Sequence, residues 1–282
     1  MSELNSELLD SLTDLAGKLA DVAAQETLPR FRSSGLSTQN KLDESGFDPV
    51  TEADKASEAA MRAILAAARP DDGIFGEEQA RTFGKSGLTW VLDPIDGTRA
   101  FISGLPTWST LIALDDGQTG RIGIIDQPYL GERFVGVMSD RPKAWLQSRS
   151  GVQALSTRTG VGLETATMFT TDPYLFDAEE LSAFQTVRNH ARLTRFGTDC
   201  YAYALLAMGQ IDVVIESGLQ AYDIASHVPL IQAAGGVVTN WEGGDCRWGG
   251  QVVAAGSAEL HAEVLAYLTG AAKQPVVDGQ ES

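Results

Sequence analysis

Two aspartates in the stretch WVLDPIDGTRAFISG, residues 90–104, could hold a divalent metal ion. Three apolar residues beginning at Trp90 predict the end of a buried strand, and Asp93 and Asp96 follow at once. Because proline has no N–H and restricts the residue before it, we expect the strand to stop at Asp93-Pro94. Both carboxylates would then lie in a tight turn with apolar packing behind them, and convergent oxygens of this kind suit Mg²⁺.

The two residues after this pair add features that a ligand site would use. Gly97 allows the backbone to approach a ligand closely, and Thr98 contributes a hydroxyl and an N–H. A hairpin turn rich in Asp and Gly is the alternative that the local sequence leaves open.

Further acids precede this stretch. Thr51 and Asp54 have the spacing of a helix start, so Asp54 could be a capping carboxylate. Glu77 and Glu78 end a short strand expected over residues 73–79, where adjacent acids are usually only solvated. Their closeness in sequence to the aspartate turn makes a shared site an open possibility.

A late acid, Asp223, opens the helical segment that ends at Gly235-Gly236. An acid in a first helical turn lies in a favourable field and is, taken alone, most often an N-terminal cap. The three histidines, in contrast, lie on expected helices without a paired Ser or Cys nucleophile, so ordinary core or surface roles are expected for them.

Composition narrows the class of function. The chain has 282 residues, of which 43% are hydrophobic, and a formal net charge of −17. This charge argues against nucleic acid and anionic membranes as partners, since both require basic surfaces. Two cysteines, Cys200 and Cys246, are too few for a disulfide framework. With no apolar run of about 18 residues and no secretory signal, we expect a cytoplasmic protein.

Hydrophobic periodicity predicts a mixed α and β protein. An antiparallel meander is expected after the aspartate turn. We expect an N-terminal α+β half over 1–142 with the metal-binding motifs, a C-terminal α/β half over 143–270 with the substrate-side residues, and a disordered tail over 271–282. The polar loop over 31–49, which contains Lys41, is expected to close over the substrate.

Four blocks together resemble one known family. They are DPVTEAD (48–54), GEE (76–78), DPIDGT (93–98) and the late YD (222–223). This set is similar to the inositol monophosphatase family of Mg²⁺-dependent, lithium-sensitive phosphatases, over about residues 10–268. The resemblance implies a layered αβαβα sandwich, an α+β fold, that usually assembles as a homodimer.

The resemblance also implies a metal ligand set. Glu77, Asp93 and the carbonyl oxygen of Ile95 match the ligands of a first Mg²⁺. Asp93, Asp96 and Asp223 match those of a second, and a third, weaker ion would rely on Glu77 and water. Two or three ions per active site would follow.

Catalytic and phosphate-binding roles are implied in the same way. Thr98 and Asp54 match the pair that orients the attacking water, with Glu77 as the third catalytic residue. Gly97 and Thr98 match the residues whose N–H groups bind the phosphate, and Asp223 matches a position that also faces the substrate.

The second half bears on which phosphate ester is hydrolysed. The segments IIDQPYLGERF and GTDCYAYALLAMGQIDVVIESGLQAYD resemble most closely the histidinol-phosphate phosphatase branch, which acts in histidine biosynthesis. Asp199 stands where inositol-type members tend to have a small residue, and Glu216 matches a position that contacts the organic part of the substrate. Two carboxylates suit a cationic leaving group. Tyr222 replaces the Trp of many inositol-type members and is expected to alter pocket shape.

Alternatives to this interpretation remain. Asp199 could simply cap the helix that follows it. An inositol-1-phosphate or broad sugar-phosphate phosphatase is the nearest rival activity, and hydrolysis of 3′-phosphoadenosine 5′-phosphate is a further one. A non-catalytic homologue or a structural metal-binding protein would be expected to have a broken ligand set, or no Thr98 and Asp54 pair.

Overall fold

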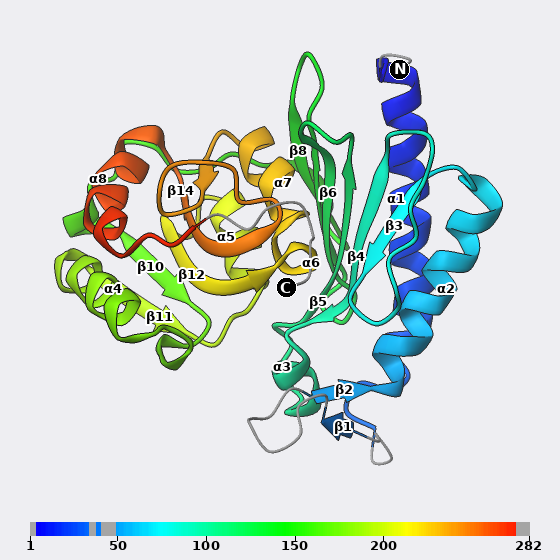
Figure 1. Ribbon diagram of the computed structural model, residues 1–282, viewed down its shortest axis with the longest axis horizontal. Helices are drawn as coiled ribbons and strands as arrows, with labels where there is room; N and C mark the ends of the chain where they lie inside the picture. Colours follow the sequence, from blue (N-terminus) through cyan, green and yellow to red (C-terminus); the bar gives the residue numbers. More distant parts are fainter. Residues whose placement is uncertain (1–3, 34–37, 41–48, 275–282) are drawn as a thin grey trace.

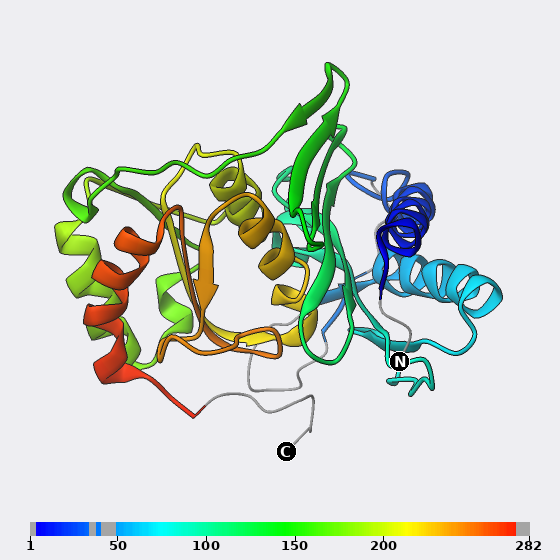
Figure 2. The same ribbon diagram turned by 90° about the horizontal axis from the view of Figure 1, so that it is seen from above.

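The computed structural model describes residues 4–33, 38–40 and 49–274, and these form five layers (Figure 1). Helices α1 (Ser6–Thr27) and α2 (Glu52–Ala68) cover one face of a seven-stranded sheet. Short helices α5 (Tyr201–Ala207), α6 (Ala221–Ile224) and α7 (His227–Ala233) lie between this sheet and a five-stranded one. The outer layer holds α4 (Ala178–His190) and α8 (Ala258–Leu268) (Figure 2). The expected αβαβα fold is therefore confirmed.

The larger sheet has the strand order β3-β4-β5-β6-β7-β8-β9. Its strands are β3 (Gly73–Gly76), β4 (Thr89–Asp96), β5 (Ser109–Asp115), β6 (Gly120–Gln127), β7 (Glu132–Val137), β8 (Lys143–Ser148) and β9 (Gly151–Ala154). Only β3 and β4 are parallel, so the predicted antiparallel meander is confirmed.

This sheet continues past residue 142, where we expected the first half to end. Strands β8 and β9 pair with β7 and with each other, so the sheet boundary falls at Ala154. Every side chain of β9 is exposed. A strand without a buried face shows no apolar alternation, and for that reason the sequence pattern did not reveal it.

Strand β4 also differs from expectation, because it does not stop at Asp93-Pro94. Asp93 pairs with Leu111 and Asp96 pairs with Ser109, with a register shift between the two pairs. Pro94 and Ile95 form a bulge at that shift, and a bulge tolerates the missing proline N–H while it re-aims the neighbouring side chains. Thr110 Oγ1 donates to the Pro94 carbonyl oxygen at 2.8 Å and supports the bulge.

The smaller sheet has the order β11-β10-β12-β14-β13. Its strands are β10 (Thr167–Thr170), β11 (Leu193–Phe196), β12 (Val213–Gln220), β13 (Val237–Thr239) and β14 (Gly249–Ala255). The helix expected from Asp223 to Gly235 is divided into α6 and α7. Residues Ala225 and Ser226 separate these two helices.

The remaining elements are short. Strands β1 (Thr38–Asn40) and β2 (Pro49–Thr51) form an antiparallel hairpin before α2, and α3 (Thr98–Ile102) follows β4. Single 3₁₀ turns are η1 (Leu163–Thr165), η2 (Pro173–Leu175) and η3 (Thr269–Ala271). Lys41 and the tail from residue 275 lie outside the described residues. Among the residues described, no helix is long and apolar enough to span a membrane.

Candidate active site

Three carboxylates converge where β4 ends and α6 begins. Asp93, Asp96 and Asp223 each offer one oxygen, and these oxygens all lie within 4.8 Å of one another. The first two come from the bulged end of β4 in the larger sheet, whereas Asp223 follows β12 of the smaller sheet. The site is therefore built by both halves of the chain.

Asp93 lies at the centre of this group and is only 1% exposed. Its Oδ1 accepts a hydrogen bond from the Ile95 N–H at 3.0 Å, which fixes the carboxylate across the bulge. Burial raises the pKa of Asp93 well above its usual range, and the charges of Glu77, Asp96 and Asp223 raise it further. Glu77 is also hydrogen-bonded to Asp93, so it belongs to the same cluster.

A backbone N–H of the C-terminal half of the chain holds the Asp96 carboxylate in place. Its Oδ2 accepts the Cys200 N–H at 2.9 Å, at the start of α5. Burial raises the pKa of Asp96 as well, although the bonds from Cys200 lower it. Residue 97 has φ +83°, and a Cβ there would lie 3.2 Å from both the Trp108 Cα and the Asp199 Cβ. Glycine is needed at position 97 for both reasons.

Asp223 and Asp54 each cap a helix, and Asp223 also belongs to the cluster. Asp223 Oδ2 accepts the Gln220 N–H at 2.7 Å, so it does cap α6. Asp54 Oδ2 accepts the N–H of Thr51 at 2.9 Å within a capping box, and burial raises the pKa of Asp54 to about 6. Because a carboxylate has two oxygens, a capping bond is compatible with a second role.

The other predicted residues of this region follow β4 directly. Thr98 opens α3, and its hydroxyl donates to the Ile95 carbonyl oxygen at 3.1 Å. The first N–H groups of a helix have no partner within the helix and favour anions, and Gly97 and Thr98 stand at that end of α3. The predicted pairing of Thr98 with Asp54, and the role of the Ile95 carbonyl as a metal ligand, stay predictions.

Asp199 lies near Asp96 of the carboxylate cluster and does not cap α5. The N-cap position belongs to Cys200, and Asp199 has φ +46°, a conformation that aspartate tolerates better than most residues. Burial raises the pKa of Asp199 to about 7, and the charge of Asp96 adds to this, while Arg99 and Thr107 lower it. The sequence pattern did not single out Arg99 or Thr107, although both follow the DPIDGT block closely.

Glu216 lies in the middle of β12, directly before a register shift of that strand, and is 3% exposed. Oε1 accepts the Thr171 N–H at 2.7 Å and the Thr171 hydroxyl at 3.0 Å. Burial raises the pKa of Glu216 to about 8, and the charge of Asp199 contributes. Glu216 therefore acts electrostatically on Asp199, which in turn interacts with Asp96 of the carboxylate cluster.

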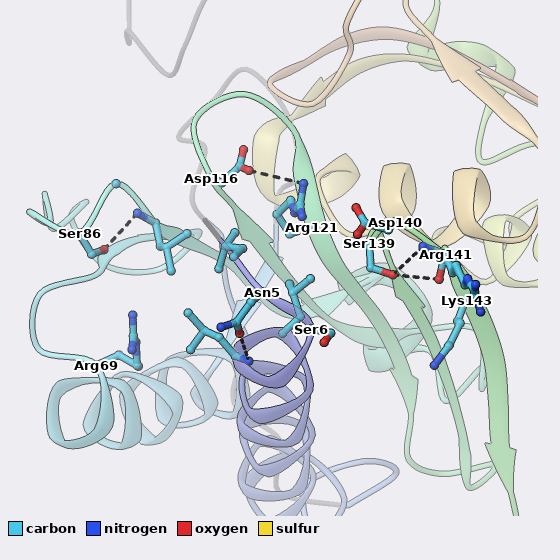
Figure 3. A pocket seen from close by; sticks show the side chains of 15 residues that line it. Asn5, Ser6, Arg69, Ser86, Asp116, Arg121, Ser139, Asp140, Arg141 and Lys143 are labelled. Carbon is cyan, nitrogen blue, oxygen red and sulfur yellow. Dashed lines mark hydrogen bonds and ion pairs between the residues drawn. The ribbon is translucent and has the colours of Figure 1, made fainter. Parts of the chain in front are cut away.

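A separate cleft of about 1040 Å³ lies at the start of α1, away from these residues (Figure 3). Its lining includes Arg69, Arg121, Arg141 and Lys143 but none of the predicted site residues. Arg69 Nε lies 2.8 Å from Asp72 Oδ2, and Arg121 Nη1 lies 3.8 Å from Asp116 Oδ2, so both form ion pairs. This cleft is therefore distinct from the carboxylate cluster.

The fold and the cluster together define a class of protein. Carboxylates at this spacing repel one another, and oxygen ligands of this kind bind hard divalent cations. A two-sheet α+β sandwich that presents such a group has the features of a metal-dependent enzyme.

Comparison with known proteins identifies the family. Residues 8–273 match the model of the inositol monophosphatase family, so the chain belongs to that family and is a phosphatase of it. The family expected from the sequence is confirmed. The family is metal-dependent, typically on Mg²⁺, and the carboxylate cluster fits that requirement.

Individual relatives agree with this assignment. The bifunctional phosphatase IMPL2 of Arabidopsis thaliana is 38% identical, over 94% of this chain and 77% of its own length. The histidinol-phosphatase of Streptomyces coelicolor is 33% identical over 93% of this chain and 98% of its own. The solved structure of an inositol monophosphatase from Zymomonas mobilis has a TM-score of 0.80 and 41% identity, over 95% of this chain and 99% of that one.

Proposed function

We propose that the protein is an Mg²⁺-dependent phosphomonoester hydrolase whose substrate is L-histidinol phosphate. The observation that carries the substrate assignment is a pair of neighbouring carboxylates: partly exposed Asp199, which interacts with Asp96 of the carboxylate cluster, and buried Glu216, which interacts with Asp199. Similarity to histidinol-phosphatases at 32–34% identity supports it.

In this proposal the cluster holds two Mg²⁺ ions, with a third, weaker one near Glu77. Glu77, Asp93 and the Ile95 carbonyl serve the first ion, and Asp93 with Asp96 and Asp223 serves the second. Bound divalent ions lower the pKa of a ligand water and neutralise charge on the attacking and leaving oxygens. The raised pKa of Asp93 supports the assignment, because it reflects burial together with the like charges of Glu77, Asp96 and Asp223, which a bound cation would offset.

The protein's own groups position the reactants. Thr98 and Asp54, with Glu77, orient the attacking water, and the N–H groups of Gly97 and Thr98 bind the phosphate at the start of α3. The hydroxyl of Thr98 already lies on the Ile95 carbonyl, next to the proposed first ion. Phosphoryl transfer requires mainly positioning and charge stabilisation from the protein, which matches this set of groups.

The leaving group of the substrate explains the acidic pair. Histidinol carries an ammonium group and an imidazole, and a cation held by Asp199 and Glu216 would favour their ionised forms. The pKa values of about 7 for Asp199 and about 8 for Glu216 mean that the empty site retains protons near neutral pH. Binding of histidinol should therefore release protons to the buffer.

The deciding experiment is phosphate release from histidinol phosphate, inositol-1-phosphate and 3′-phosphoadenosine 5′-phosphate, each with Mg²⁺ and with a chelator. We expect the highest kcat/KM for histidinol phosphate and no turnover with chelator. Equal or faster hydrolysis of inositol-1-phosphate would reject the substrate assignment but leave the phosphatase assignment in place.

Inositol-1-phosphate, or a broad range of sugar phosphates, is the second candidate. The 41% identity to the Zymomonas mobilis inositol monophosphatase favours it. Neutral polyols would need only hydrogen bonds from Asp199 and Glu216, so neutralising either carboxylate should then change activity little. The substrate panel above separates these two outcomes.

We also propose a cytoplasmic homodimer. Side chains that are apolar and exposed gather around the edge strand β11 and the nearby turn η2: Tyr174, Leu175, Leu193 and Phe196. Unpaired sheet edges with apolar side chains favour association. Light scattering of the purified protein should give twice the monomer mass, and a monomer mass at micromolar concentration would contradict the proposal.

A further inference from the structure

The chain segment that contains Glu77 is held in place by a buried carboxylate of α2. Glu58 has a side chain that is 0% exposed, and it faces the backbone that follows β3. Its Oε2 accepts the Glu78 N–H at 2.7 Å and its Oε1 accepts the Gln79 N–H at 3.1 Å. One carboxylate thus binds the N–H groups of both residues that follow Glu77.

Arg62, one helical turn after Glu58, completes the anchor. Its Nε donates to Glu58 Oε1 at 2.7 Å, and its Nη2 donates to the Gln79 carbonyl oxygen at 3.1 Å. A buried carboxylate is tolerated when its charge is paired and its oxygens are hydrogen-bonded, and both conditions hold for Glu58. The Glu58–Arg62 pair therefore binds both a donor and an acceptor of Gln79.

Gly76 makes the close approach of this carboxylate possible. A Cβ at position 76 would lie 2.3 Å from Glu58 Oε1 and 2.4 Å from its Cδ. No side chain fits in that space without displacing the carboxylate. The GEE block thus contains a glycine whose absence of a side chain admits Glu58, followed by the acid that Glu58 positions.

The opposite side of the same segment is tied to β4. The Glu77 N–H donates to the Leu92 carbonyl oxygen at 3.2 Å, and Gly76 pairs with Leu92 in the parallel ladder. Leu92 directly precedes Asp93, with which Glu77 interacts. Residue 77 is therefore fixed on one side by the strand that carries Asp93 and on the other by the α2 anchor.

We propose that Glu58 is a positioning residue for metal binding, which acts on Glu77 through the backbone N–H groups of Glu78 and Gln79. The inference rests on the proposed function, in which Glu77 is a metal ligand. Removing a group that orients a metal ligand costs about 10- to 100-fold in metal affinity or activity. The same range is expected for the loss of the Glu58 carboxylate.

The test is Mg²⁺ binding to the full-length protein, measured by calorimetry without substrate. E58Q turns an acceptor into an amide that cannot bind both N–H groups, so we expect the Mg²⁺ dissociation constant to rise about 10- to 100-fold. The Mg²⁺ concentration for half-maximal activity should rise in parallel, while kcat at saturating Mg²⁺ should fall much less. R62K, which keeps the charge but loses the planar fork, should weaken Mg²⁺ binding by a smaller factor and serves if E58Q does not fold.

Glu180 provides the matched control. It is 1% exposed and accepts from the Asp177 N–H at 2.9 Å and from Gln251 Nε2 at 2.8 Å, on the outer helix α4. E180Q is the same substitution at a similarly satisfied site, and it should leave Mg²⁺ affinity unchanged.

The outcomes separate the two proposals. Wild-type protein that binds no Mg²⁺ would reject the proposed function itself. Wild-type binding of normal strength with unchanged affinity in folded E58Q and R62K would overturn the role of Glu58. An equal loss of Mg²⁺ affinity in E180Q would show that any buried charge has this effect and would also overturn it.

Discussion

Replacement of Asp93 by asparagine is expected to change stability in opposite directions with and without metal. In D93N the Oδ1 that accepts the Ile95 N–H is retained, so the bulge of β4 keeps its bond. The substitution removes one negative charge from a group whose ligand oxygens lie within 4.8 Å of one another. In chelator, the variant should therefore be more stable than the wild type.

The size of this effect follows from the geometry. Two full charges at the 4.8 Å limit repel by about 3.5 kcal/mol at an effective dielectric constant of about 20. Protonation limits the strain in the wild type, because the raised pKa of Asp93 lets it bind a proton instead of bearing the full repulsion. We expect a gain of about 1–3 kcal/mol at pH 8, which corresponds to an increase in Tm of about 2–8 °C.

With Mg²⁺ the order should reverse. A ligand at about 100 times its Kd stabilises the folded state by about 2.7 kcal/mol, and D93N should lose most of this. Its kcat should fall by about 100- to 1,000-fold or more, since Asp93 is the proposed ligand of both ions. Thermal melts in chelator and in Mg²⁺, together with phosphate release, measure all three quantities.

D212N is the control for this experiment. Asp212 is buried like Asp93 but is paired, with the Arg158 Nε at 2.8 Å and the Thr167 N–H at 2.7 Å. Breaking a buried pair is strongly destabilising, so D212N should lower Tm in both buffers and leave the Mg²⁺-induced shift intact. A lower Tm for D93N in chelator at pH 8, or wild-type kcat in Mg²⁺, would refute the reasoning.

Three further predictions concern the same region. D199A should raise the KM for histidinol phosphate about tenfold or more, because one charged contact is lost. Its hydrolysis of p-nitrophenyl phosphate should stay unchanged. Equal losses of activity on both substrates would mean that Asp199 has a structural role. The pKa values of Asp54, Asp199 and Glu216 are raised to about 6, 7 and 8, so their stabilising protonated forms are present at low pH and lost as pH rises. The Tm in chelator should therefore fall between pH 5 and pH 8, and a flat or rising profile would contradict this. G97A should lower Tm by more than G87A, because both positions have positive φ but only residue 97 is crowded; equal shifts would argue against crowding.

Local patterns were sufficient for most elements of the fold. The short strand expected over 73–79 occurs as β3 (Gly73–Gly76), and the antiparallel meander follows the aspartate turn as expected. The errors occurred where local pattern and tertiary structure disagree. Strand β9 buries no side chain, and the bulge at Pro94-Ile95 depends on pairing with β5, which no local sequence encodes.

For the candidate site, residue types were easier to predict than their contacts. The DPIDGT block identified Asp93 and Asp96 because two acids around a proline at a strand end are uncommon. The bond from the Cys200 N–H to Asp96 joins residues 104 positions apart, and sequence spacing cannot reveal it. Glu58 was overlooked for a similar reason. In the sequence it is one more acid on a helix, and only the fold places it against the backbone beside Glu77.

The charge of the protein has a consequence for how a phosphate ester could bind. The formal net charge is −17, and the acids around Asp93 add a strongly negative local field. An anion would be repelled from this site in the absence of cations, whereas bound metal ions can invert the local sign. Metal and substrate should therefore bind with positive coupling, and by linkage each should tighten the binding of the other by the same factor. Under the proposed function, inorganic phosphate should bind measurably in Mg²⁺ and not in chelator, and it should lower the apparent dissociation constant of Mg²⁺. Phosphate affinity that does not depend on Mg²⁺ would show that the carboxylates do not control access to the site.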